Sequence, residues 1–437
     1  MAIIKSRKVL PGVHLKHAKN TSELNTVPLP LPQFVRIPMQ QHMGQESIPT
    51  VSVGDTVYVG QKIGDSTAQM GIPMHSSVSG TVKRIEDCLT SGGKFVKAVV
   101  IETDGKQTPF PELAPPQVSN RAEFIAAVRE SGLSGLGGAG FPTHMKLDYK
   151  NIDQVDTLII NGAECEPYIT SDYRECMEHP QDIADGIKLV MSYLSLTKCV
   201  IGIENNKPKA IALLSEVTDS MSGVSVMPLK SRYPQGAEKV LVYSATGKVI
   251  EEGQLPADCG VIVMNISTVS ALSKYFKTGM PLISRRLTVD GDAVSQPKNI
   301  EVPLGVSIRD VLEFCGCNPE DCRKILMGGP MMGISVPDVD LPIIKNNNAI
   351  LAFKNSQPSY TKTTACIRCG KCTRVCPVKL MPAALERAYD NRNSEALKSL
   401  KVNLCINCGC CSYICPAKRD LAAKNQLAKA MLREKKG

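Results

Sequence analysis

Two copies of one cysteine pattern, Cys-x2-Cys-x2-Cys-x3-Cys-Pro, occupy residues 366–377 (the first repeat) and 405–416 (the second repeat). Three cysteines at this spacing present three thiolates from one tight turn of backbone, and where two such repeats occur the fourth cysteine ligates the other cluster. Gly370 and Gly409 lie inside the turns, where a backbone that wraps closely around a cluster needs a residue without a side chain. The pattern therefore predicts two [4Fe-4S] clusters with crossed ligation. The predicted ligands are Cys366, Cys369, Cys372 and Cys415 for the first cluster, and Cys405, Cys408, Cys411 and Cys376 for the second.

Structural zinc sites are the alternative interpretation, because they also use Cys-x2-Cys pairs. Zinc needs four ligands and no proline-terminated triplet, whereas two iron–sulfur clusters account for all eight cysteines of the repeats. We therefore expect iron. Cys410 falls outside the pattern and is interpreted as a non-ligating thiol. For Cys315, Cys317 and Cys322, unpaired buried thiols are favoured over a further metal or redox site.

Length and composition limit the class of protein. A chain of 437 residues is expected to form three or four domains, and 17 cysteines without a secreted-domain framework indicate a reducing compartment. Residues 1–10 contain no long apolar region, and no segment approaches the ~18 consecutive apolar residues of a membrane span, so we expect a cytoplasmic protein. The net charge of +9 favours an acidic redox partner or an anionic membrane surface, although such charge is also common on solvated surfaces. Nucleic acid is not expected as a partner, because the sequence has no basic stripe interleaved with aromatics, Trp is absent and aromatic residues make up 4% of the chain.

Residues 30–103 alternate short β-type runs with glycine turns, which predicts an all-β module. Two short motifs, at residues 53–57 and 79–82, resemble the halves of a biotinyl/lipoyl-type barrel-sandwich. Residues 64–71 contain no acceptor lysine, so a docking or scaffolding role is favoured over a swinging arm. The predicted strands are residues 34–38, 51–55, 57–60, 79–82 and 98–102.

After a proline-rich break at residues 109–116, strands and helices alternate, which predicts a parallel sheet covered by helices, with ligands at the carboxyl ends of its strands. The predicted strands are residues 155–161, 199–203 and 261–264, and the predicted helices are 121–131, 180–192 and 209–220. Further on, strand-like residues 286–291 and 302–308 lead into a predicted helix at 308–315. A linker at residues 354–362 precedes the cysteine repeats, and helices are predicted at 382–399 and 421–432.

The loop at residues 135–143 contains five small residues in six positions and exposes several backbone N–H groups, which suits a phosphate, especially if a helix begins at His144. A purely steric role for these glycines is the alternative, and the spacing differs from the usual dinucleotide fingerprint. Lys146 supplies a nearby positive charge. Asn161, Glu164 and Glu166 follow a predicted buried strand, where such polar groups are expected to serve a ligand rather than the core.

Residues 135–146 together with 161–167 resemble the FMN- and NADH-binding subunit of respiratory complex I, and more closely the C subunit of the Rnf (Rsx) ion-translocating electron-transport complexes. The resemblance extends over nearly the whole chain. It includes residues 233–239 (Tyr-Pro-Gln-Gly-Ala-Glu-Lys), 265–268 (Asn-Ile-Ser-Thr), 327–333 (Met-Gly-Gly-Pro-Met-Met-Gly) and both cysteine repeats.

This resemblance implies an α/β multidomain fold. The expected domains are an N-terminal β barrel-sandwich hybrid module (1–108), a Rossmann-like α/β domain for FMN and NADH (115–280), a β-grasp SLBB domain (281–353) and an α-helical ferredoxin-like domain with two [4Fe-4S] clusters (360–437).

The resemblance also implies roles for particular residues. Glu166 is expected to face the nicotinamide nucleotide and to be the catalytic residue. Leu136 stands where the complex I protein has arginine, so the contact that the arginine makes is in doubt here. The residues expected around the FMN phosphate are Gly135, Gly137, Gly138, Gly140 and Lys146. Those expected around the flavin are Asn161, Glu164, Gly236, Glu238, Asn265 and Thr268.

The implied function is that of a peripheral electron-transfer subunit, an oxidoreductase that exchanges a hydride with NAD(H) at non-covalent FMN and passes single electrons through the clusters. Its expected partners are the other subunits of a membrane-bound Rnf-type complex on the cytoplasmic side of the membrane, with ferredoxin reached through them. Residues 11–16 depart from the Gly-Gly-x-His-Pro-Pro expected of this family. A soluble protein that serves a dedicated reductase, such as proline reductase, therefore remains an alternative. A second alternative is a non-catalytic cluster relay in which the flavin domain is vestigial.

Overall fold

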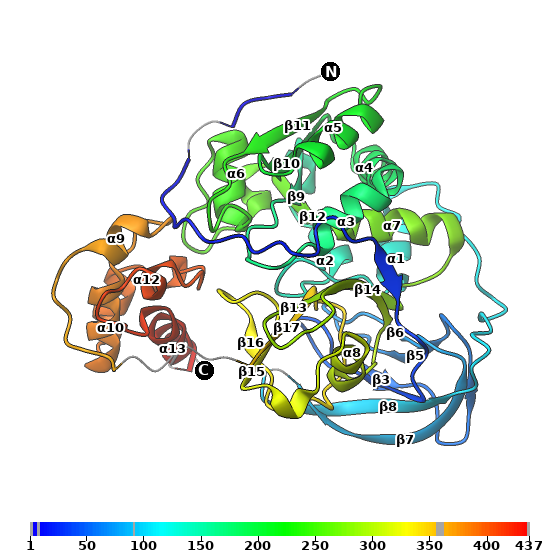
Figure 1. Ribbon diagram of the computed structural model, residues 1–437. Coiled ribbons are helices and arrows are strands. Elements are labelled where there is room, and N and C mark those ends of the chain that lie inside the picture. The colour runs from blue at the N-terminus through cyan, green and yellow to red at the C-terminus, as the bar shows by residue number, and fades with distance from the viewer. Residues whose placement is uncertain (1–2, 7–8, 91, 355–361, 435–437) are drawn as a thin grey trace.

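The computed structural model describes residues 3–6, 9–90, 92–354 and 362–434, and most of the predicted linker at 354–362 lies outside them. Figure 1 shows a β-rich part in blue and cyan, an α/β part in green, a second β-rich part in yellow and a helical part in orange and red. This mixed α/β arrangement confirms the predicted fold class. Within the described residues, no helix reaches both the length and the apolar character needed to cross a bilayer.

The first β-rich part contains two antiparallel sheets around an apolar core. A strand predicted at residues 51–55 is wrong. The Asp55 carboxylate accepts the Ser52 N–H at 2.8 Å, and Gly54 has a left-handed φ of +97°, so the chain turns there instead. The strands of the larger sheet, in order, are β2 (Phe34–Pro38), β8 (Phe95–Thr103), β7 (Gly80–Leu89) and β4 (Thr56–Val57). Those of the smaller sheet are β3 (Ile48–Pro49), β5 (Lys62–Asp65) and β6 (Met74–His75).

The α/β part is a four-stranded parallel sheet, as predicted, and helices cover both of its faces. Leu158 and Ile160 point to one face, which packs on α4 and α7, while Ile159 between them points to the face covered by α6. Both faces are buried, so the strands are continuously apolar. The strand order is β11 (Val224–Leu229), β10 (Lys198–Glu204), β9 (Thr157–Gly162) and β12 (Val261–Asn265). The helices are α1 (Arg121–Glu130), α2 (Thr143–Leu147), α3 (Ser171–Glu178), α4 (Pro180–Tyr193), α5 (Pro208–Val217), α6 (Glu238–Thr246) and α7 (Ile266–Thr278), with 3-10 turns at Ile152–Gln154 and Pro256–Cys259.

The second β-rich part is a six-stranded mixed sheet with α8 (Ile308–Phe314) and a 3-10 turn at Pro319–Asp321. Cys315 and Cys317 belong to its core, and the Sγ atoms of Cys317 and Cys322 lie 3.3 Å apart. Its buried Lys345 donates to the carbonyls of Pro73 and Gly132, and so ties this part to the first sheets and to the α/β part. The strand order is β1 (Thr26–Pro28), β14 (Lys298–Pro303), β13 (Ser284–Asp290), β17 (Ala349–Phe353), β15 (Lys324–Met327) and β16 (Ile334–Ser335).

The described residues of the N-terminal segment pair with the α/β part and with the second β-rich sheet. Residues 26–28 form β1 beside β14, and Val13 exchanges backbone hydrogen bonds with Tyr233 at 2.8 and 3.0 Å. The segment from residue 9 to residue 28 therefore crosses the α/β part before the chain enters the barrel module (Figure 1).

The helical part contains both cysteine repeats. The single helix predicted at residues 382–399 is wrong, because Arg392 adopts φ +50° and the Asn393 side chain caps a new helix by accepting the Ala396 N–H. The last helix pairs with α10 and closes a small apolar core, which confirms the amphipathic helix predicted at 421–432. The helices are α9 (Lys371–Val375), α10 (Pro382–Asp390), α11 (Ser394–Ser399), α12 (Cys410–Tyr413) and α13 (Leu421–Glu434), with a 3-10 turn at Val402–Leu404.

Candidate functional site

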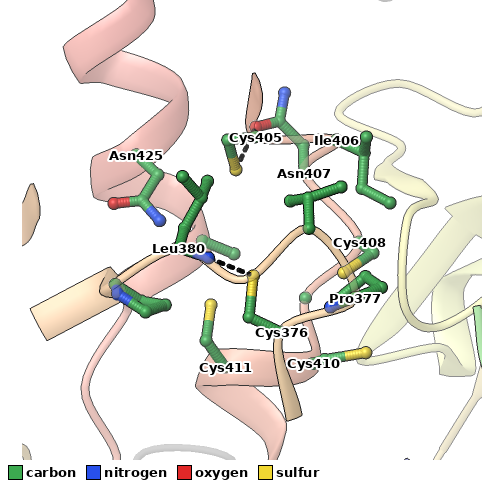
Figure 2. A pocket seen from close by; sticks show the side chains of 14 residues that line it. Cys376, Pro377, Leu380, Cys405, Ile406, Asn407, Cys408, Cys410, Cys411 and Asn425 are labelled. Carbon is green, nitrogen blue, oxygen red and sulfur yellow. Dashed lines mark hydrogen bonds between the residues drawn. The ribbon is translucent and has the colours of Figure 1, made fainter. Parts of the chain in front are cut away.

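Four of the predicted cluster ligands border one cavity in the helical part (Figure 2). Cys376 comes from the first repeat and reaches a cavity whose other cysteines, Cys405, Cys408 and Cys411 among them, all come from the second repeat. The remaining lining is mostly apolar and includes Leu380, whose N–H donates to the Cys376 Sγ at 3.3 Å. This donor set of four thiols around an apolar cavity fits a [4Fe-4S] cluster with one ligand from the other repeat.

The other predicted ligands lie near the surface. Cys366 and Cys369 are exposed, and Cys372 and Cys415 are half-buried. A zinc ion holds each thiolate at about 2.3 Å, and among the described residues no three His, Cys, Asp or Glu side chains are grouped closely enough for a single ion.

The second repeat packs directly against the α/β part. Cys408 and Cys410 share an apolar cluster with Val13 and Tyr233, and Cys165 and Met331 pack against it. The Cys410 thiol points at the Tyr233 carbonyl, with 3.9 Å between Sγ and oxygen. The second cluster site therefore lies where three parts of the chain meet.

The glycine loop at residues 135–140 packs against the start of α7. The Leu136 N–H donates to the Thr268 hydroxyl at 3.0 Å, and a Cβ on Gly137 would lie 2.5 Å from the Asn265 amide nitrogen. A Cβ on Gly138, by contrast, would meet no heavy atom within 4 Å. The loop thus presents open backbone at Gly138, as close approach of a phosphate requires.

Other residues predicted for the phosphate and flavin pair with one another. Lys146 in α2 donates to the Glu238 carboxylate at 3.1 Å and to the Val263 carbonyl at 2.9 Å, in the middle of β12. The Asn161 amide donates to the Gly236 carbonyl at 2.8 Å. These side chains come from α2, α6 and β9, so the structure brings them together at one edge of the parallel sheet.

Asn265 and Thr268 lie at the same edge. The Asn265 side chain caps α7 by accepting two backbone N–H groups, and its amide donates to the Asp172 carboxylate at 2.8 Å. Asp172 also accepts the Ser267 hydroxyl at 2.6 Å. Asn265 is therefore held by Asp172 in the first turn of α3, a residue that sequence reasoning missed.

Glu164 is buried in the loop that follows β9. One carboxylate oxygen accepts the Asp172 N–H at 2.8 Å, and the other has no hydrogen-bond partner among the described residues. Burial raises the pKa of Glu164 to about 7, although the Lys19 ammonium 4.0 Å away opposes the shift. A buried carboxyl with a free oxygen is a group that a ligand can satisfy.

Glu166 is held by the second β-rich part. Its carboxylate accepts the N–H groups of Met331 and Met332 at 3.0 and 2.9 Å, and a Cβ on Gly329 would lie 2.3 Å from it. Burial raises the pKa of Glu166, and these two N–H donors oppose the shift. The loop at residues 328–333 is thus shaped to receive this carboxylate.

Sequence reasoning also missed Lys19 and Arg285. Lys19 donates to three carbonyls of the loop after β9, and Arg285 donates to the Leu136 carbonyl at 3.3 Å. Each is separated from its partner by more than 140 residues, so no local signal could have revealed it. Only the glycine- and methionine-rich motif at 327–333 pointed to the Glu166 contact.

Four family models match successive segments of the chain. They describe the RnfC barrel sandwich hybrid domain at residues 8–106, the Nuo51 FMN-binding domain at 128–274, the SLBB domain at 286–335 and a 4Fe-4S dicluster domain at 359–416. This order is the one expected from the sequence.

Relatives with similar sequences cover most of the chain. The C subunit of the proton-translocating ferredoxin:NAD(+) oxidoreductase complex of Clostridium ljungdahlii is 39% identical over 378 residues, 86% of this chain and 82% of that protein. The C subunit of the Na(+)-translocating ferredoxin:NAD(+) oxidoreductase complex of Acetobacterium woodii is 39% identical over 388 residues, 87% of each chain. The C subunit of the ion-translocating oxidoreductase complex of Rhodobacter capsulatus is 36% identical over 390 residues, 87% of this chain and 75% of that one.

Among solved structures, a chain of the NAD+-reducing [NiFe]-hydrogenase in the air-oxidized state aligns with a TM-score of 0.50 and 19% identity. The alignment covers 72% of this chain and a little under two thirds, 63%, of that chain. At this identity the likeness concerns the fold alone.

Proposed function

This chain belongs to the RnfC family, the C subunits of Rnf-type ion-translocating ferredoxin:NAD(+) oxidoreductase complexes, and from that premise we propose that it exchanges a hydride with NAD(H) and passes electrons singly through two [4Fe-4S] clusters. FMN, when bound, supplies the chemistry that links a two-electron donor to one-electron acceptors. The protein would then hold the nucleotide, the flavin and the two clusters in sequence, with the flavin at one end of the electron path and the partner protein at the other.

The observation that carries this proposal is the packing of the second repeat on the α/β part. Cys408 and Cys410 contact Tyr233, which is three residues from Gly236, and Cys165 lies between Glu164 and Glu166. The second cluster, held by Cys376 and the second repeat, is therefore proposed to be next to the flavin. The first cluster, whose Cys366 and Cys369 are exposed, is proposed to face the partner.

The open glycine loop and Lys146 are proposed to bind the FMN phosphate, because a phosphate needs unshielded N–H donors and a cation. The backbone N–H donors would come from Gly135, Gly137, Gly138 and Gly140. Lys146 would either break its ion pair with Glu238 or interact with both Glu238 and the phosphate. The residues proposed for the isoalloxazine end are Asn161, Glu164, Gly236, Glu238, Asn265 and Thr268. Carboxylates belong at that end, since they accept hydrogen bonds from ring N–H and ribose hydroxyl groups but repel a phosphate.

Glu166 is proposed to contact the nicotinamide nucleotide. Its two backbone donors hold the carboxylate in one orientation, which pre-organises it for a ligand hydroxyl or amide. The loop at residues 328–333 then contributes to the nucleotide end from another part of the chain.

For partners, we propose the other subunits of an Rnf-type complex, with this chain attached peripherally on the cytoplasmic side of the membrane. High-salt or alkaline washing should then release the protein from membranes without detergent. Extraction only by detergent would contradict peripheral attachment, and co-purification with a soluble reductase instead would favour the dedicated-reductase alternative.

The central experiment is anaerobic reduction of cluster- and FMN-loaded protein by NADH. Flavin absorbance should bleach, NAD+ should form, and electron paramagnetic resonance should then show reduced clusters. If the loaded protein takes up flavin but NADH reduces neither centre, the proposed function is wrong. Failure to take up any flavin would instead favour the non-catalytic relay.

A further inference from the structure

Lys19 reaches from the N-terminal segment into the loop at residues 163–170, which carries two of the predicted acidic site residues, Glu164 and Glu166. Its ammonium donates to the carbonyl of Glu164 at 2.9 Å, to that of Glu166 at 2.8 Å and to that of Ile169. An ammonium has three N–H donors, and here all three point at carbonyls of one loop. The side chain is only 14% exposed, so water does not compete freely for these contacts.

The path of the N-terminal segment holds Lys19 in this place. Val13 pairs with Tyr233, and the His17 carbonyl accepts the Tyr168 N–H at 2.9 Å. Ala18, between His17 and Lys19, adopts a left-handed φ of +48°, which turns the chain so that Lys19 points inward. Tyr168 is left-handed as well, with φ +70°, where the loop bends around the ammonium.

The charges around Lys19 explain why the loop needs a cation. Glu164 and Glu204 bring two buried carboxyls, and Lys207 donates to Glu204 at 2.9 Å and to the Glu164 carbonyl at 3.4 Å. Burial lowers the pKa of Lys19, while Glu164 and Glu204 oppose that shift. Lys207 is committed mainly to Glu204, so Lys19 is the cation that faces the open oxygen of Glu164.

We propose that Lys19 is a positioning residue for the nucleotide end of the site: by binding three carbonyls of the loop at 163–170, it holds Glu166 in the arrangement that NAD(H) requires, with Glu164 kept at the flavin end of the same loop. The inference rests on the proposed function for its nucleotide, but the geometry of the loop is independent of it. Lys19 itself need not touch the nucleotide, because it acts through the backbone of the two acidic residues.

The test uses full-length, cluster- and FMN-loaded Lys19→Ala protein, with Lys16→Ala as the matched control, since Lys16 is exposed on the same segment. Lys19→Ala should raise the NADH concentration for half-maximal flavin bleaching by about tenfold, with a smaller change in the maximal rate. Added n-propylammonium should largely restore the parent value, because it can replace the missing ammonium. Tetramethylammonium, which has no N–H donors, should not. A merely structural defect would not respond to these amines in this way.

Hydrogen exchange provides a readout without nucleotide. The amides of residues 163–170 should exchange faster in Lys19→Ala, and n-propylammonium should slow them again. If the parent protein is not bleached by NADH, the proposed function fails, and exchange alone then decides the inference. Should Lys19→Ala not fold, Lys19→Gln replaces it, since an amide retains part of the donor set. Unchanged NADH dependence together with unchanged exchange, or equal effects of Lys16→Ala, would overturn the role of Lys19.

Discussion

Gly138→Val should weaken binding of the FMN phosphate without destabilising the fold. In the protein without ligand, a Cβ at Gly138 meets no atom within 4 Å, and its backbone is not left-handed. The substitution should therefore change folding stability by no more than about 0.5 kcal/mol, as for other exposed sites. A phosphate that approaches the loop, however, would meet the valine side chain and lose backbone donors.

The size of the loss follows from the chemistry of the contact. Each hydrogen bond to a charged group contributes about 1.5–3 kcal/mol. Loss of two such bonds would weaken FMN by about 3–6 kcal/mol, or roughly 100- to 10,000-fold. Riboflavin lacks the phosphate, so its affinity should change little. Quenching of flavin fluorescence by apo-protein measures both dissociation constants.

Gly137→Ala is the matched control, because its Cβ would lie 2.5 Å from the Asn265 amide nitrogen. This neighbour must move, so Gly137→Ala should disturb the loop itself, weaken FMN and riboflavin alike and lower the melting temperature. Iron content should stay at the parent value in both variants. If Gly138→Val lowered the affinities for FMN and riboflavin equally, or lowered neither, the placement of the phosphate would be refuted.

Three further predictions concern other parts of the chain. Cys376→Ala should abolish the second cluster and spare the first, because the Cys376 side chain lies among the cysteines of the second repeat; electron paramagnetic resonance that shows only the first cluster lost would contradict the crossed ligation. Glu166→Gln should keep FMN but raise the KM for NADH by about tenfold, and steady-state kinetics at limiting NADH would expose an unchanged value. Burial lowers the pKa of Lys345 to about 7 from its ordinary 10.5, so the folded protein favours the neutral amine. As pH falls from 10.5 to 7, the unfolded chain binds a proton at this lysine that the folded protein does not, and the free energy of unfolding decreases. Thermal unfolding of the parent and Lys345→Met between these pH values should show the parent losing stability relative to the variant as pH falls, and parallel curves would show that the amine does not titrate there.

The sequence determined the features whose chemistry lies within a short stretch of chain. The cysteine repeats place their ligands within a dozen residues, so spacing alone predicted the clusters, and the glycine loop has its donors in its own backbone, so its composition indicated a phosphate as one of two interpretations. The parallel sheet was also predictable, because continuous apolar runs alternate with helical segments. The predicted secondary structure was wrong where a side chain accepted a backbone N–H group and so ended a regular element. Asp55 turned a predicted strand, and Asn393 began a new helix within a predicted one.

Only the tertiary structure decided how these local features meet. Glu166 depends on backbone N–H groups at Met331 and Met332, and the loop that carries it depends on Lys19. Cys376 joins the cysteines of the other repeat, and Cys408 and Cys410 of the second repeat share an apolar cluster with Tyr233. A local pattern reports the preference of a segment for helix, strand or turn, but it holds no information on which distant segment will satisfy a buried carbonyl or carboxylate. That choice is made when the separate cores pack together, because only then do these polar groups lose water and need one another.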